Sequence, residues 1–278
     1  MKRGRAMNII FKEFSPQSSL APYVQSFWTG DFNINREGGF TRRVVPNGCV
    51  ELIIHLEDDH CSLLNSENQW IKSPNYLIIG TYQQPYDVQF SSAVKVFGIR
   101  FFPDGVKQIF GIHPSEFINA HENGVDVLGR SIDSFCDSLR SSPVSDECVT
   151  IANTFLEKQL GRNHQKHDYT HMAMRKIREN IGVVNHGKIL NAVPLSQRQL
   201  QREFRKIYGI TMSDYMRLSR INAIHNYLLS GKMDLTRISY SLHFADQSHL
   251  TKEFKNFIGI SPKTFSKQSD QFIVNSAF

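Results

Sequence analysis

The sequence has few cysteines and no long apolar run. Only 4 of its 278 residues are cysteine, and they lie too far apart for the CxxC spacing of a zinc or redox motif. We therefore expect reduced thiols that pack in the interior of a cytoplasmic protein, at Cys49, Cys61, Cys136 and Cys148. No apolar run approaches the ~18–20 residues of a membrane-spanning helix, so we expect no membrane partner.

Signatures of catalysis and of cofactor binding are missing as well. The sequence contains no P-loop, no GxGxxG and no nucleophile elbow around a serine. A cupin metal site needs a close His-x-His followed by Glu, whereas His55 and His60 with Glu51 and Glu57 are spaced differently. We interpret His60 and its acidic neighbours as solvated loop residues. We expect no enzyme activity, no metal and no cofactor.

The first residues, Met1–Met7, are basic but are not followed by the apolar core of a signal peptide. Two interpretations stay open: a disordered arm, or a native start at Met7. The excess of positive charge lies in the C-terminal part of the sequence. Residues 168–270 hold 16 Lys and Arg against 8 Asp and Glu, and the remaining residues hold 16 against 18. An excess in one region is typical of a domain that binds nucleic-acid phosphates.

One twelve-residue sequence occurs twice in that basic region. Leu200–Thr211 (LQREFRKIYGIT) is repeated, with conservative changes, as Leu250–Ser261 (LTKEFKNFIGIS), at an offset of 50 residues. Each copy has apolar residues at helical spacing, basic residues off the apolar stripe, and a Gly suited to end the helix. The repeat predicts two amphipathic helices that each expose a basic face.

The residues around each copy predict a helix-turn-helix. Ser196 and Gln199 form a capping box for the first helix, and Asp246 is the expected N-cap of the second. Shorter helices are predicted before them, at residues 188–192 and 235–242. Apolar residues at every third or fourth position predict one long helix over residues 212–230, which joins the two units.

These residues resemble the DNA-binding domain of the AraC/XylS family of bacterial transcription regulators. The matching pattern is Ser196-x3-Leu200-x-Arg202-x-Phe204, Gly209, Arg220-Ile221, Ile238-x3-Leu242-x-Phe244-x-Asp246-Gln247-Ser248-His249-Leu250-x3-Phe254-Lys255 and Gly259-Ile260-Ser261-Pro262. The chain departs from it at two turns. His243 stands where Gly is usual and where a left-handed backbone is expected, and the first turn has Val193-Pro194 without Gly.

The resemblance implies which side chains contact DNA. A polar outer face would be the simpler interpretation of one such helix, but the caps, the repeat and the local charge favour DNA contact. Arg198 and Arg202 take the positions of base readers in the first helix, as Arg reads guanine and Gln adenine in the major groove. Ser248 and Lys255 are expected at phosphates. The full predicted set is Gln197, Arg198, Gln201, Arg202, Lys206, Gln247, Ser248, His249, Lys252 and Lys255. Leu200, Phe204, Ile238, Leu242, Leu250 and Phe254 are assigned to the core.

The N-terminal part predicts strands and turns up to about residue 130, then helices. The expected fold class is α+β: a β-rich domain with C-terminal helices over residues 8–160, a linker over 161–168, and an all-α tandem helix-turn-helix domain over 169–270. Two sequence motifs in this part resemble the β-rich sensor domain of some of these regulators: Pro46-x-Gly48-Cys49-x-Glu51-Leu52 and Phe97-Gly98-Ile99-Arg100-Phe101-x-Pro103-x-Gly105.

That second resemblance implies effector binding, dimerisation or both, and does not identify the effector or its binding residues. Phe27, Trp28, Phe32, Phe40 and Trp70 are interpreted as core, with an apolar pocket as the alternative. The pair Arg42-Arg43 is interpreted as solvated, with an anion clamp as the alternative.

We therefore expect a sequence-specific DNA-binding regulator whose two helices read successive major grooves, about one turn (~34 Å) apart. The expected partners are double-stranded promoter DNA, RNA polymerase if the protein is an activator, a small-molecule effector and a second copy in a homodimer. The sequence does not distinguish activator from repressor. Two alternatives stay open: a constitutive or architectural DNA-binding protein whose N-terminal domain only oligomerises, and an enzyme domain fused to a DNA-binding domain.

Overall fold

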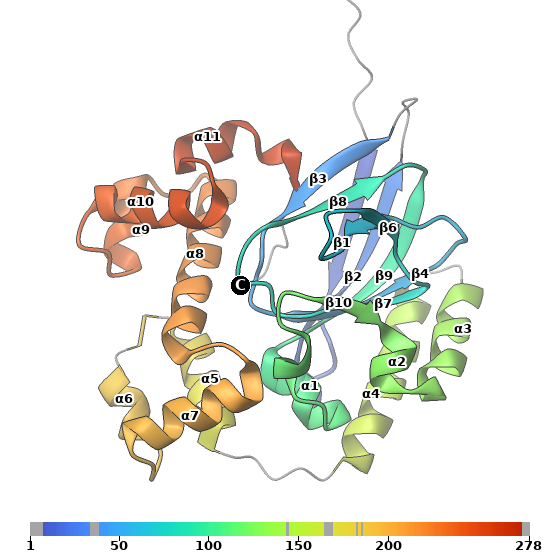
Figure 1. Ribbon diagram of the computed structural model, residues 1–278, viewed down its shortest axis with the longest axis horizontal. Coiled ribbons are helices and arrows are strands. Elements are labelled where there is room, and N and C mark those ends of the chain that lie inside the picture. The colour runs from blue at the N-terminus through green and yellow to red at the C-terminus, as the bar shows by residue number, and fades with distance from the viewer. Residues whose placement is uncertain are drawn as a thin grey trace, which may run out of the picture.

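The computed structural model describes residues 8–33, 39–142, 145–163, 169–181, 183–184 and 186–273. The basic start, residues 1–7, and most of the predicted linker, residues 164–168, lie outside this range. Figure 1 shows a β-rich N-terminal part beside a helical C-terminal part. The predicted fold class is confirmed.

Two sheets face each other in the N-terminal domain. The six-stranded sheet has the order β1-β2-β9-β4-β7-β10, and the five-stranded sheet has the order β11-β3-β8-β5-β6. The strands are β1 (Asn8–Phe14), β2 (Val24–Asn33), β3 (Phe40–Val44), β4 (Val50–His55), β5 (Ser62–Leu64), β6 (Trp70–Lys72), β7 (Tyr76–Ile79), β8 (Tyr86–Phe90), β9 (Val94–Phe101), β10 (His121–Asn123) and β11 (Phe272–Ile273). Residues 46–48 form the predicted turn, where Gly48 has φ 78° and the chain passes from β3 in one sheet to β4 in the other.

Because side chains alternate between the two faces of a strand, the aromatic residues predicted as core lie in two different apolar cores. Phe27 joins the apolar core between the larger sheet and the helices, whereas Trp28 and Phe32 join the core between the two sheets. Phe40 is partly buried against that second core. Trp70 is different, because it lies on β6 at the edge of the smaller sheet and is 40% exposed. The core assignment of Trp70 is therefore wrong.

Helices follow the strands in the N-terminal domain, as predicted. They are α1 (Pro103–Phe110), η1 (Pro114–Phe117), α2 (Gly124–Leu128), η2 (Arg130–Ile132), α3 (Asp133–Ser141) and α4 (Ser145–Arg162). Figure 1 shows these helices gathered below the sheets. Helix α4 continues through residues 161 and 162, which were assigned to the linker, so its helical pattern extends past Leu160.

The C-terminal part contains α5 (Tyr169–Glu179), α6 (His186–Leu190), α7 (Gln197–Tyr208), α8 (Met212–Ser230), α9 (Leu235–Ser241), α10 (Gln247–Ile258), α11 (Pro262–Lys267) and η3 (Ser269–Gln271). The long helix predicted over residues 212–230 is α8. The part is not all α, however. Its last described element, β11, leaves the helices and pairs in parallel with β3 of the N-terminal domain.

A buried group of charges joins the two parts. Asp104 of α1 is 0% exposed, and its Oδ1 lies 3.0 Å from Nη1 of Arg178 on α5. Nδ1 of His171, also on α5, lies 2.8 Å from Oδ2 of Asp104. Arg178 donates from Nη2 to the Pro22 carbonyl at 3.1 Å, and its guanidinium stacks 3.7 Å from the centre of the Phe102 ring. Helix α5 is thereby held directly against the N-terminal domain.

Candidate DNA-binding surface

The first repeated helix, α7, begins with the predicted capping box. The Ser196 hydroxyl accepts from the Gln199 backbone N–H at 3.3 Å, and the Gln199 side-chain oxygen accepts from the Ser196 backbone N–H at 3.1 Å. The helix ends at Gly209, whose φ of 73° needs a residue without Cβ strain, and whose N–H donates to the Arg205 carbonyl at 2.8 Å. Both ends of α7 are therefore fixed by local sequence.

The second repeated helix, α10, is capped in the same manner. The Asp246 carboxylate accepts from the His249 backbone N–H at 2.7 Å. Gly259 ends the helix with a φ of 91°, and its N–H donates to the Lys255 carbonyl at 2.8 Å. The turn before this helix contains His243 with a φ of 55°, which confirms the left-handed backbone expected there.

The apolar faces of both helices are buried as predicted. The six residues assigned to the core are at most 1% exposed: Leu200, Phe204, Ile238, Leu242, Leu250 and Phe254. The first two belong to one apolar cluster and the other four to a second, so each unit has a core of its own.

The opposite faces carry the predicted DNA-contacting residues. All ten side chains are exposed: Gln197, Arg198, Gln201, Arg202, Lys206, Gln247, Ser248, His249, Lys252 and Lys255. Five come from α7 and five from α10, and the structure thus groups them on two helices without bringing all ten together. The N-terminal domain contacts α7 at the end opposite its first turn, where a Cβ at Gly209 would lie 2.3 Å from Ile118.

Some of these side chains already have partners. Arg202 donates from Nη2 to the Glu203 carboxylate at 3.0 Å, at the surface, where such a pair contributes little stability. The Gln247 side-chain oxygen accepts from the Thr236 hydroxyl at 3.1 Å, which links α10 to α9. Within the described ranges, no carboxylate lies at ion-pair distance from Arg198 or Lys252. Their charges are available to an external partner.

The spacing of the two helices is set by α8. Figure 1 shows α7 near one end of α8 and α10 near the other. With 19 residues and a rise of ~1.5 Å per residue, α8 is about 28 Å long. That length is close to the ~34 Å between successive major grooves on one face of DNA.

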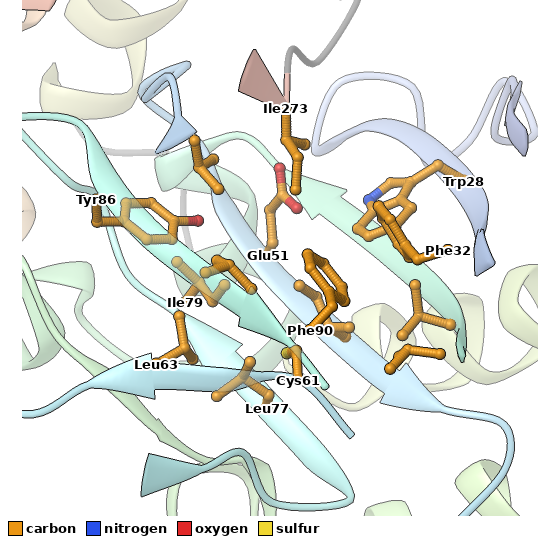
Figure 2. A pocket seen from close by; sticks show the side chains of 15 residues that line it. Trp28, Phe32, Glu51, Cys61, Leu63, Leu77, Ile79, Tyr86, Phe90 and Ile273 are labelled. Atoms are coloured by element: carbon orange, nitrogen blue, oxygen red, sulfur yellow. The ribbon is translucent and has the colours of Figure 1, made fainter. Parts of the chain in front are cut away.

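The N-terminal domain encloses a small apolar cavity between its two sheets, which Figure 2 shows. Its volume is about 50 Å³, and aromatic side chains from β2 and β8 form part of its wall, among them Trp28, Phe32 and Phe90. Trp28 and Phe32 are thus core residues and also part of the cavity wall, so both interpretations apply to them. Gly98 lies opposite Trp28 in the strand register, and a Cβ at Gly98 would be 2.0 Å from the indole ring. The glycine of the Phe97–Arg100 motif therefore makes room for Trp28.

A buried charge cluster borders this cavity, and sequence reasoning missed it. Arg100 is 0% exposed, and it donates from Nε to Glu51 at 2.8 Å and from Nη1 to Glu13 at 2.6 Å. Burial alone would lower the pKa of Arg100, but the two carboxylates outweigh it and the pKa is raised. The signal was available in the sequence, since an Arg within an otherwise apolar strand needs buried acidic partners.

The histidine pair His55 and His60 lies in the interior of the N-terminal domain. His60 is 8% exposed and donates from Nδ1 to the Ser73 carbonyl at 2.7 Å, so its assignment to a solvated loop is wrong. His55 stacks on it at 4.3 Å, and burial with the neighbouring His60 lowers the pKa of His55 to about 4. In the part of the chain that the structure describes, no three His, Cys, Asp or Glu side chains are placed to hold a metal ion.

Other predicted side chains have plain structural roles. All four cysteines are buried and form no disulfide, and burial raises the pKa of the Cys49 thiol to about 12. Arg43 is exposed and binds Asp87 through Nε at 2.9 Å and Nη2 at 3.1 Å, and Arg42 lies 4.8 Å from the centre of the Phe40 ring. The description of Arg42 and Arg43 as merely solvated is therefore incomplete. Across the described residues, no helix combines the length and apolarity needed to span a membrane.

Two family domains match the chain. Residues 189–268 match a family described as "Helix-turn-helix domain", and residues 12–123 match a "Domain of unknown function (DUF6597)". The resemblance to AraC/XylS regulators is thereby confirmed: the C-terminal part is a helix-turn-helix domain of the AraC type, preceded by a separate domain. The matched relatives are regulators of transcription, in line with the predicted class.

Curated relatives resemble the C-terminal part. The Msm operon regulatory protein of Streptococcus mutans is 31% identical over 80 residues, and the transcriptional activator AarP of Providencia stuartii is 35% identical over 66 residues. These matches cover 29% and 24% of this chain, and 29% and 49% of the relatives. The chain thus spans under half the length of either relative.

Solved structures are similar over more of the chain but only weakly. ToxT from Vibrio cholerae is 13% identical, with a TM-score of 0.48, over 87% of this chain and 98% of ToxT. The AraC-like activator CuxR is 11% identical, with a TM-score of 0.36, over 92% of this chain and 89% of CuxR.

Proposed function

We propose that this protein is a cytoplasmic, sequence-specific DNA-binding regulator of bacterial transcription. One observation carries the proposal. Two helices, α7 and α10, each begin at a side-chain N-cap, end at a left-handed Gly, bury equivalent apolar faces, and expose basic and amide side chains at the two ends of α8. An α8 about 28 Å long between the two helices suits successive major grooves on one face of promoter DNA.

Individual roles follow from the position of each side chain. Arg198 and Arg202 in the first turns of α7 read guanine, with Gln197 and Gln201 beside them. In α10, Gln247, His249 and Lys252 take the corresponding places. Ser248, Lys255 and Lys206 bind phosphates, which orients the protein without reading sequence.

The N-terminal domain regulates this activity through a small-molecule effector, through formation of a homodimer, or both. Its enclosed apolar cavity supports the effector role, and the buried Asp104 contacts give it a direct connection to α5. An activator would also contact RNA polymerase. The architectural alternative is less well supported, because an architectural binder needs no exposed base-reading side chains such as Arg198 at the start of α7 and Gln247 at the start of α10.

The experiment is a substitution of one base reader. Arg202→Ala should cost about 1–3 kcal/mol in binding to the preferred site and relax the base preference at one position. The matched control is Arg175→Ala, since Arg175 is an exposed Arg of α5 that pairs with Glu179 and lies off both recognition helices. Both variants are titrated against the selected site and single-base variants of it. Equal weakening of Arg202→Ala on every sequence would make Arg202 a phosphate contact.

A further inference from the structure

The cavity between the sheets is closed by the last described strand of the chain. In β11, Phe272 and Ile273 pair with Arg43 and Val44 of β3, and the Val45 N–H donates to the Ile273 carbonyl at 3.3 Å. The Ile273 side chain lines the cavity, and Figure 2 shows it pointing toward Glu51. A segment that follows the DNA-binding helices therefore forms part of the wall of the N-terminal cavity.

The same strand is attached to the second helix-turn-helix unit. The Phe272 ring lies 4.8 Å from the ring of Phe265 on α11, and Phe265 is fully buried in the core that also contains Phe254 of α10. Val45, next to β3, packs in that core as well. Occupancy of the cavity and the position of α10 are thus connected through β11.

The strand β11 is short, and it can detach from β3 at low free-energy cost. The strand has two residues, both only partly buried, at the edge of the five-stranded sheet. Short edge segments with few buried contacts open at low free-energy cost, well before the domain unfolds. The remaining wall of the cavity consists of longer strands and stays in place.

The volume shows that a ligand must displace Ile273. The cavity of about 50 Å³ is far smaller than the ~150 Å³ cavity that holds benzene. When the Ile273 side chain withdraws, its four carbon atoms leave that space to a ligand. Pairing of β11 and binding of a ring-sized molecule therefore exclude each other.

The polar groups at the cavity select the ligand's chemistry. Trp28 is 5% exposed, and its Nε1–H has no hydrogen-bond partner among the described residues, which is uncommon for a buried donor. Figure 2 shows this nitrogen on the side of the ring that faces Glu51. At that end Arg100 is already paired with Glu51 and Glu13, so a ligand anion would be buried without a cation of its own, which is disfavoured.

We propose that the cavity binds a small, uncharged, apolar molecule with one hydrogen-bond-accepting oxygen, and that this ligand replaces Ile273 and releases β11. The oxygen accepts from Trp28 Nε1, and the apolar body fills the space between the sheets. Release of β11 removes one of the two contacts that attach the second helix-turn-helix unit to this edge of the sheet and leaves the Val45 contact alone. This inference deepens the regulatory part of the proposed function and depends on it.

The test uses three probes of one shape: benzyl alcohol, toluene and benzoate. Calorimetric titration of the full chain should show that Ile273→Ala binds benzyl alcohol at least tenfold more tightly than the wild type. Ile71→Ala is the matched control, since Ile71 is 48% exposed on β6 and does not line the cavity, and it should bind as the wild type does. Equal affinity of Ile273→Ala and the wild type, or binding of benzoate as tight as that of benzyl alcohol, would overturn the proposal.

Two further measurements keep the result interpretable. Trp28→Phe should lose the preference for benzyl alcohol over toluene, and a preserved preference would contradict the assigned role of Nε1. In the wild type, benzyl alcohol should speed hydrogen exchange at the Val45 amide, and unchanged exchange at saturation would contradict release of β11. Sequence-selective DNA binding is measured separately without probe, so its failure would count against the proposed DNA-binding function and not against the cavity.

Discussion

The two helix-turn-helix units are alike within themselves but are attached to the N-terminal domain differently. At the first unit, Gly209 packs so closely on η1 that a Cβ would lie 2.3 Å from Ile118, and the buried Asp104 holds α5 nearby. At the second unit, attachment runs through the two-residue strand β11 and through Val45. Repeated local sequence thus gives equal helices, while unequal attachment makes the second unit the one that can be released.

The largest expected effect tests the similarity of the two cores. Phe204→Ala and Phe254→Ala each remove a fully buried ring from one unit, and each should lower the free energy of unfolding by about 3–5 kcal/mol. Urea unfolding measures both, with Tyr240→Ala as control, since Tyr240 is 73% exposed and should matter by less than about 0.5 kcal/mol. A small loss for only one of the two rings would show that the cores are not equivalent.

The next effect tests the firm attachment of the first unit. Asp104→Asn keeps the shape of the side chain but leaves the Arg178 charge without its buried carboxylate, which should cost about 3 kcal/mol. The control is Asp126→Asn, an exposed acidic residue of α2. Hydrogen exchange in α5 should rise together with the loss of stability. If Asp104→Asn is as stable as the control, the charge cluster does not hold the two parts together.

Lowering the pH should destabilise the second helix-turn-helix unit through His225. Burial lowers the pKa of His225, which lies in α8 with its ring 5.6 Å from Phe265, to about 4. The unfolded chain, with a His pKa near ~6.5, binds the proton first, so His225 stabilises the fold above pH ~6.5 and this stability is lost as pH falls toward 4. Lowering the pH from 7 to 5 should cost about 2 kcal/mol through this group.

The measurement for this prediction is urea unfolding at several pH values for the wild type and His225→Gln. The variant should lose about that share of the pH dependence, and an identical dependence in both proteins would assign it to other groups. His55 in the N-terminal domain has a pKa lowered in the same direction, to about 4, and should supply a similar remaining share.

The smallest effect compares the two helix caps. Ser196→Ala and Asp246→Ala each remove an acceptor for a backbone N–H in the first turn and should cost about 1 kcal/mol. The Asp246 variant should cost slightly more, because its charge also interacts with the helix dipole. Thermal unfolding of both variants beside the wild type checks this order. The reverse order would mean that the capping box of α7 outweighs the charge at α10.

The features that sequence predicted are those fixed by local spacing. Caps at Ser196 and Asp246, the left-handed turn at His243 and the length of α8 depend on residues within a few positions of one another. The burial of His60, the charge cluster around Arg100 and the pairing of β11 with β3 depend on residues far apart in the chain, such as Glu13 and Arg100. Periodicity carries no information on which distant strands become neighbours, so these contacts could not be predicted from it.

The most direct test of the central claim is selection of bound DNA from a random-sequence pool, at near-physiological salt, for the wild type, Arg198→Ala and His249→Ala. Two helices that read successive grooves should select two short boxes whose centres are about 10 base pairs apart. Each variant should lose the base preference in a different box. A single box, or an unselective pool whose binding falls steeply with salt, would contradict the account and favour an architectural DNA-binding protein.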